Sequence, residues 1–171
     1  MKRLISYIII IIAGFLMQVS VFPMLPYAFS SPNLLLIIVV SYGFMMGKQA
    51  GMLAGLFSGL LLDLFYGDTI GFYALIYMYI GYVNAICNQY YYEEYVNLPL
   101  ILCGIDTIVL GIYIYVFQFL FRSRMDFGYY FIKIILPEMI YTLVVTLVGY
   151  QIFLLINRRM EEKEKESDTF V

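Results

Sequence analysis

Residues 47–71 read GKQAGMLAGLFSGLLLDLFYGDTIG, a stretch in which a small or acidic residue returns at every fourth position. Lipid tails are as apolar as leucine, so helices in a membrane associate where small residues let their backbones approach closely. The stretch therefore predicts a transmembrane helix built for close contact with other helices. The positions of the repeat are Gly47, Gly51, Gly55, Gly59, Asp63, Gly67 and Gly71.

The glycine row winds around its own helix. Four residues advance an α-helix by about 400°, so the row drifts by ~40° at each step. One neighbouring helix follows the whole row only if it crosses at an angle; otherwise successive glycines meet different neighbours. The partner of the row is either another helix of the same chain or a helix of a second subunit.

The composition is that of a membrane protein. The chain has 171 residues, of which 63% are hydrophobic and 13% are charged, and its mean hydropathy is +0.88. Soluble domains average about 25% charged residues, and several apolar runs here approach the ~20 residues that span a bilayer. The net charge of −2, with no basic stripe, gives no sign of nucleic-acid binding.

The residue types that carry most enzyme chemistry are scarce. Histidine is absent, which removes the commonest general base and the commonest metal ligand. Cys87 and Cys103 lack metal-ligand spacing and are expected to pack as apolar residues. The sequence therefore predicts no catalytic residue, no metal site and no cofactor. The 18 tyrosines, with no tryptophan, are expected to supply the aromatic belts at the membrane surfaces.

Six apolar segments predict six transmembrane helices in one bundle, an all-α membrane fold. The spans cover about residues 4–22, 33–46, 49–66, 69–88, 98–121 and 130–156, so residues 1–157 form one domain and residues 158–171 a charged tail. At ~1.5 Å per residue, the second span is shorter than a ~30 Å hydrocarbon core. Pro137 is expected to weaken the last helix near Lys133, four residues earlier.

The distribution of cations predicts the orientation of the bundle. Six spans place both chain ends on one side of the membrane, and cytoplasmic segments carry an excess of lysine and arginine. Only Arg122 and Arg124 lie clearly on the opposite side. Both termini are therefore predicted to be cytoplasmic. The cations on that side are Lys2, Arg3, Lys48, Arg158, Arg159, Lys163 and Lys165.

Asp63 stands near the C-terminal end of the third span, where the helix dipole disfavours a carboxylate. It therefore needs hydrogen-bond donors, and the nearest are the free backbone N–H groups at the start of the fourth span. We expect Asp63 to act as a structural clasp on the turn between Gly67 and Gly71. Binding of a partner or ligand, and proton relay, are the alternatives. Asp68 is expected to cap the fourth helix.

Asp106 and Glu138 lie deeper, in the fifth and sixth spans. Carboxylates inside a membrane either serve a function or are hydrogen-bonded by polar neighbours, and the available neighbours are Asn84, Gln118 and Gln18. The sequence leaves both possibilities open. An aspartyl-protease pair of Asp63 and Asp106 is disfavoured, because the expected G-x-G-D context is missing.

Residues 59–82, GLLLDLFYGDTIGFYALIYMYIGY, resemble the core motif of MreD, the rod shape-determining membrane protein family of bacteria. Residues 32–37, PNLLLI, also resemble the second segment of that family. The length, the six spans and the short charged tail agree with the family as well. The motif positions in this chain are Gly59, Asp63, Gly67, Gly71, Gly81 and Tyr82.

The resemblance implies a non-catalytic scaffold of the bacterial inner membrane, in the machinery that builds sidewall peptidoglycan. The resemblance implies that the direct partner is MreC. Through MreC the protein would associate with MreB, RodA and a class B penicillin-binding protein. It also implies a fold similar to the substrate-binding subunits of energy-coupling-factor transporters.

Two other functions stay open. A vitamin-binding subunit needs an outward polar cavity lined by Asp63, Asn84, Asp106 and Glu138. Proton-coupled transport needs Asp106 or Glu138 to face water.

Overall fold

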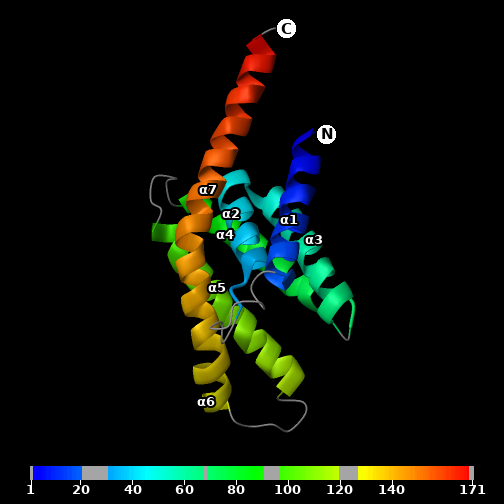
Figure 1. The fold of residues 1–171 in the computed structure, drawn as a ribbon, viewed down its shortest axis with the longest axis vertical. Helices are drawn as coiled ribbons and strands as arrows, with labels where there is room; N and C mark the ends of the chain where they lie inside the picture. The colour runs from blue at the N-terminus through cyan, green and yellow to red at the C-terminus, as the bar shows by residue number, and fades with distance from the viewer. Residues whose placement is uncertain (1, 21–30, 68, 91–96, 120–126, 170–171) are drawn as a thin grey trace.

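The computed structural model describes residues 2–20, 31–67, 69–90, 97–119 and 127–169, which form helices joined by turns and contain no strand. Successive long helices run in alternating directions, so α1 begins and α7 ends toward the same end of the molecule (Figure 1). The elements are α1 Lys2–Ser20, α2 Leu34–Met46, α3 Lys48–Tyr66, α4 Phe72–Tyr90, α5 Asn97–Ile114, the π-helix η2 Tyr115–Phe119, α6 Phe127–Tyr130, the π-helix η4 Phe131–Ile135 and α7 Leu136–Thr169.

The short helix α2 is the centre of the fold. Its 13 residues are apolar on all sides, and every residue from Leu35 to Phe44 is buried. A helix that is hydrophobic all round belongs in a core rather than at a surface. The helices α1, α3, α4, α5 and α7 pack around it. Because α2 lies inside the protein, its length does not have to match the thickness of a membrane.

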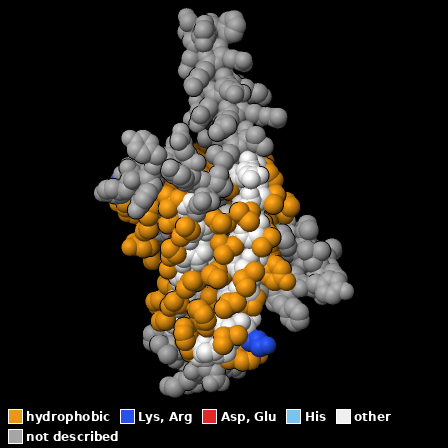
Figure 2. All heavy atoms as spheres, turned by 90° about the vertical axis from the view of Figure 1, so that its left-hand side faces the viewer, with side chains coloured by type: hydrophobic (Ala, Val, Ile, Leu, Met, Phe, Trp, Pro, Cys, Tyr) orange, Lys and Arg blue, Asp and Glu red, His pale blue; other side chains and the backbone are white. Residues whose placement is uncertain are grey.

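The outer helices carry an exposed apolar surface. Within the part of the chain that the structure describes, three helical stretches are long and apolar enough to cross a membrane, namely Lys48–Tyr66, Leu98–Phe117 and Phe127–Ile152. Shorter apolar helices cover Ile8–Ser20, Leu34–Met46 and Phe72–Cys87. In Figure 2, apolar side chains are spread over most of the described face, and a basic side chain is visible only near its lower end. The all-helical bundle with this surface agrees with the predicted membrane protein.

The π-helical turn η2 packs on α6, the short helix that precedes the second π-helical turn η4. The ring of Tyr115 lies 5.2 Å from that of Tyr130 and 5.0 Å from that of Phe127. The weakened helix predicted at Lys133 is confirmed, since the π-helix η4 spans Phe131–Ile135 and ends two residues before Pro137. A proline has no N–H to bond the carbonyl four residues back, so the local turn widens.

Several helix limits differ from the sequence expectation. The fourth helix begins at Phe72 rather than at residue 69, because Gly71 has a φ of +102° that does not continue a helix. The helix of the last predicted span continues beyond residue 156, because α7 extends through Thr169 and the backbone of the charged tail is helical in its described part. Gln118 and the loops 91–96 and 120–126 lie outside the residues whose side chains the structure describes.

Candidate functional site

The glycines of α3 face α4, and the contact between these two helices is the most extensive of the fold. A Cβ atom on Gly55 would collide with the backbone of Tyr77 and Met78, and one on Gly59 with the backbone of Ala74. Side chains of ordinary size at these positions would push the helices apart. The row therefore meets a helix of its own chain, and α4 occupies the space that a second subunit would need.

Three glycines from three helices meet at one point of this interface. A Cβ on Gly51 of α3 would lie 2.5 Å from the carbonyl oxygen of Gly81 of α4 and 2.7 Å from the Cα of Gly43 of α2. A Cβ on Gly43 would lie 2.6 Å from that same Gly81 oxygen. We call Gly43, Gly51 and Gly81 the glycine junction. It lets the central helix α2 and the α3–α4 pair approach to backbone contact.

Three other glycines of the repeat lie in turns rather than in the helix interface. Gly47 and Gly71 have φ values of +86° and +102°, and no heavy atom lies within 4 Å of a Cβ built on either. They provide the left-handed backbone that L side chains rarely adopt. The three heavy atoms nearest to a Cβ on Gly67 all belong to the backbone of Asp63 in the preceding helical turn. The expected interhelical packing therefore does not extend to Gly47, Gly67 and Gly71.

The carboxylate of Asp63 is 2% exposed and joins the end of α3 to the start of α4. Its Oδ2 accepts hydrogen bonds from the N–H groups of Gly71 at 2.8 Å and Ala74 at 3.1 Å, and its Oδ1 accepts one from Tyr73 at 2.7 Å. These are the backbone donors that the sequence indicated. Asp68, the cap expected from the sequence, lies outside the described residues, and α4 begins four residues after it.

A second polar cluster surrounds the N-terminus of the buried helix α2. Asn33 is its N-cap and accepts a hydrogen bond from the N–H of Leu36 at 3.0 Å. The same side-chain oxygen accepts one from the hydroxyl of Tyr77 on α4 at 2.8 Å. Glu138 on α7 is hydrogen-bonded to the Asn33 side chain. Four unpaired N–H groups at a helix start are costly inside a membrane, and this cluster satisfies part of them.

Two further side chains complete this cap from other helices. Gln18 of α1 accepts a hydrogen bond from the N–H of Leu35 at 3.1 Å. Thr142 of α7 accepts one from the N–H of Asn33 at 3.2 Å. The N-terminus of α2 is thus held by side chains from α1, α4 and α7. We call Gln18, Asn33, Tyr77, Glu138 and Thr142 the α2 cap cluster.

Asp106 of α5 pairs with Asn84 of α4. The Asn84 amide donates to Asp106 Oδ2 at 2.6 Å and to the carbonyl of Ile80 at 2.9 Å. Both side chains are buried, with Asn84 fully so. Of the neighbours that the sequence offered for Asp106, Asn84 is the one it meets. The pair bridges α4 and α5 one helical turn from Gly81 of the glycine junction.

The chemistry available to these side chains is hydrogen bonding between helices. Among the described residues, no group of three or more Cys, Asp or Glu side chains is placed to hold a metal ion. Asp63, Asp106 and Glu138 each have a different set of hydrogen-bond partners. The class of protein so defined is an all-helical membrane bundle whose buried polar groups join one helix to another.

A comparison with family profiles identifies that bundle more closely. The profile of the rod shape-determining protein MreD matches residues 1–159. The chain therefore belongs to the MreD family, as its motif indicated, and has a role in the determination of rod shape. No curated protein and no solved structure matches the chain. Similarity to energy-coupling-factor subunits therefore stays a prediction.

Sequence reasoning missed part of the α2 cap cluster and one residue of the glycine junction. Gly43 continues the four-residue spacing backwards from Gly47, so the spacing itself could have revealed it. Asn33 between a proline and an apolar run is a helix-start signature. Tyr77 and Thr142 carry no such signal, because their role depends on contacts across 44 and 109 residues of chain.

Proposed function

We propose that the protein is a non-catalytic scaffold of the cell-wall elongation complex in the bacterial inner membrane. It binds MreC directly and, through MreC, contributes to sidewall peptidoglycan synthesis with MreB, RodA and a class B penicillin-binding protein. Both termini face the cytoplasm. The observation that carries the proposal is the match of the MreD profile over residues 1–159.

The use of the buried polar groups supports a scaffold rather than an enzyme. Asp63 accepts three backbone hydrogen bonds, and Asn84 with Asp106 bridges α4 and α5. A catalytic carboxylate needs a reacting group within hydrogen-bond reach and a neighbour that tunes it. These groups are instead engaged with the backbone or with each other. We therefore propose that the protein functions by binding other helices and catalyses no reaction.

The vitamin-binding alternative receives less support from the structure. It needs Asp63, Asn84, Asp106 and Glu138 around one polar cavity, and these residues have separate hydrogen-bond partners. The cavity between α1, α2 and α3 has a volume of about 280 Å³ and a mostly apolar lining, in which Tyr42 and Gln49 are the polar side chains. Typical small-molecule sites measure about 300–1,000 Å³ and contain several convergent polar groups.

Affinity purification from the native bacterial membrane tests the proposal. The full chain with a C-terminal tag is extracted in a mild detergent, and co-purified proteins are identified by quantitative mass spectrometry. We expect MreC to be enriched over a tag-only control. We also expect the gene to restore rod shape to cells that lack their own MreD-family protein.

The same purified protein distinguishes the scaffold from the vitamin-binding transporter subunit. A rise in melting temperature with one vitamin, without enrichment of MreC, would support the transporter subunit instead. Capture of neither MreC nor another elongation protein by a folded, monodisperse chain would contradict the scaffold.

A further inference from the structure

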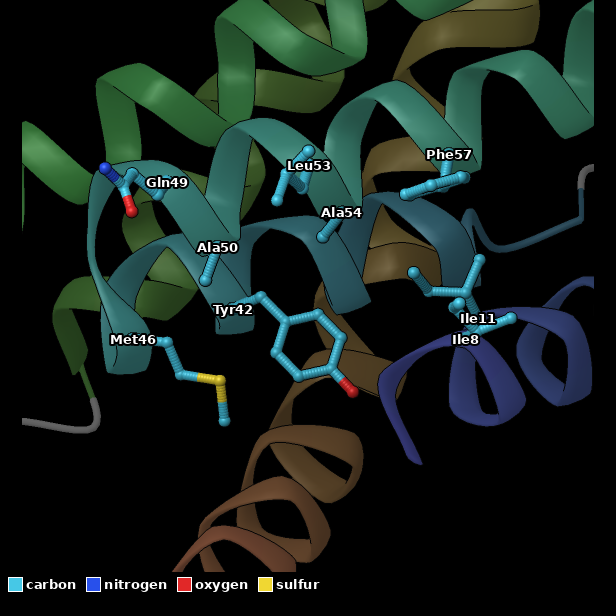
Figure 3. Close-up of a pocket in the computed structure, with 9 residues that line it drawn as sticks. All are labelled: Ile8, Ile11, Tyr42, Met46, Gln49, Ala50, Leu53, Ala54 and Phe57. Atoms are coloured by element: carbon cyan, nitrogen blue, oxygen red, sulfur yellow. The ribbon is translucent and has the colours of Figure 1, made fainter. Parts of the chain in front are cut away.

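The helices α1, α2 and α3 enclose a groove on the side of the bundle (Figure 3). Its volume is about 280 Å³. Tyr42 and Met46 of α2 form one wall, Ile8 and Ile11 of α1 a second, and a row of α3 side chains a third. The row on α3 is Gln49, Ala50, Leu53, Ala54 and Phe57.

The groove follows α3 because of how small residues are placed on this helix. Gly51 and Gly55 face α4, and Ala50 and Ala54 form the neighbouring row that lines the groove. Alanines leave room there where larger side chains would fill it. From Gln49 to Phe57 the helix rises about 12 Å at 1.5 Å per residue. A mostly apolar groove that follows α3 over this distance suits a linear hydrocarbon chain.

One end of the groove lies beside a cation, Lys48. Lys48 stands between Met46 and Gln49, at the turn from α2 to α3, and is half-buried. Lys2 and Arg3 occupy the first turn of α1, the helix that forms the second wall. Asp63 is the first acidic residue of the chain, so residues 1–62 carry three cations and no anion. The acidic tail residues belong to α7, which packs on α2, α5 and η4.

We propose that the groove binds one acyl chain of an anionic phospholipid, with the phosphate of the head group at Lys48. The mostly apolar walls accept the chain, and Lys48 at the α2–α3 turn complements the head-group charge. Basic sites between transmembrane helices are suited to anionic lipids, and each lysine or arginine near the surface strengthens binding about fivefold. The bound lipid then contacts both α1 and the α2–α3 hairpin and joins them.

The absence of tryptophan from the chain allows a direct test. The variant Phe57→Trp places a single tryptophan at the rim of the groove, where the native side chain is 42% exposed. The full chain is reconstituted into vesicles that contain brominated phosphatidylglycerol or brominated phosphatidylcholine, and quenching by each lipid gives their relative affinities. Ile105→Trp on α5, where the native side chain is 50% exposed, reports the bulk bilayer.

We expect phosphatidylglycerol to quench the Phe57→Trp protein with at least fivefold higher affinity than phosphatidylcholine, and the Ile105→Trp protein without preference. Lys48→Gln should reduce the preference about fivefold, whereas Lys133→Gln, at an exposed lysine of η4, should leave it unchanged. Ala50→Phe should remove the preference by filling the groove. Ala13→Phe, on the exposed side of α1, is its size-matched control.

Equal affinities of the two lipids at both tryptophans would overturn the proposal, since the groove would then contact bilayer lipids without selecting the anionic one. Absence of quenching at position 57 would also overturn it, because a protein segment rather than a lipid would fill the groove. Size-exclusion chromatography of each variant before reconstitution restricts the comparison to folded protein.

Discussion

Gly51 of α3 and Gly81 of α4 lie backbone against backbone, so that a Cβ on either would collide with the carbonyl group of the other. The contact is reciprocal, and Gly43 of α2 adds a third backbone to it. In a membrane, where burial of leucines gives no advantage over lipid, close backbone packing is a main source of helix association. The glycine junction is therefore the point at which the central helix and the α3–α4 pair are fixed together.

Alanine at one glycine of the junction should destabilise the fold. We expect Gly51→Ala and Gly81→Ala each to cost about 1–3 kcal/mol, the usual range for an overpacked site. Equilibrium unfolding in detergent measures the loss. Gly128→Ala on α6 is the matched control, because no atom lies within 4 Å of a Cβ there. A loss at Gly128 as large as that at Gly51 would contradict the explanation.

The double variant Gly51→Ala/Gly81→Ala tests whether the two glycines act on one contact. The first alanine already separates the two backbones, so the second should cost less than it does alone. We expect a coupling energy between about 0.5 and 3 kcal/mol, as for residues in direct contact. Strict additivity in the same unfolding assay would show that the two positions are energetically independent.

The same packing predicts a larger effect of leucine at Gly55, whose Cβ would meet the backbone of Tyr77. We expect Gly55→Leu to abolish folding or to prevent co-purification with MreC, because α4 cannot occupy its place beside α3. Fluorescence-detected size-exclusion chromatography and affinity capture measure the two outcomes. Normal capture and normal rod shape with Gly55→Leu would contradict the role of this interface.

Asp63 should protect specific amides at the start of α4. In Asp63→Asn one oxygen acceptor replaces two charged ones, and hydrogen bonds to charged groups contribute about 1.5–3 kcal/mol. We expect faster hydrogen exchange at Gly71, Tyr73 and Ala74, the three residues whose N–H groups bond the carboxylate. Exchange in α5 serves as the internal control. Unchanged exchange at all three amides would exclude the clasp.

The hydroxyl of Tyr77 should contribute to stability through the α2 cap cluster. Tyr77 is fully buried and donates to Asn33, so Tyr77→Phe leaves one acceptor of the cap without this donor. We expect a loss of about 0.5–1.5 kcal/mol in equilibrium unfolding. Tyr79→Phe changes the same group on the same helix, at a side chain that is 60% exposed, and should have no effect. Equal losses of stability in the two variants would contradict a specific contribution of the Tyr77 hydroxyl through the α2 cap cluster.

The glycine row and Asp63 were visible in the sequence because their signals are local. Spacing by four reveals a helix interface, and a carboxylate just before a turn points to the next helix start. The sequence did not show which glycines of the row lie outside the helix interface. Gly47 and Gly71 lie in turns with positive φ, and this depends on where the helices end. It also gave no sign that α2 is the buried centre, since apolar runs look alike whether lipid or protein surrounds them.

The central claim is that the protein acts by holding helices together and needs no proton carrier or catalytic carboxylate. The double variant Asp106→Asn/Glu138→Gln tests it most directly, because the amides retain the hydrogen bonds to Asn84 and Asn33 without an ionisable group. The measurement is MreC co-purification and cell shape in cells that carry only this variant. We predict wild-type capture and normal rods. Loss of rod shape with a stable, normally abundant variant would contradict the claim.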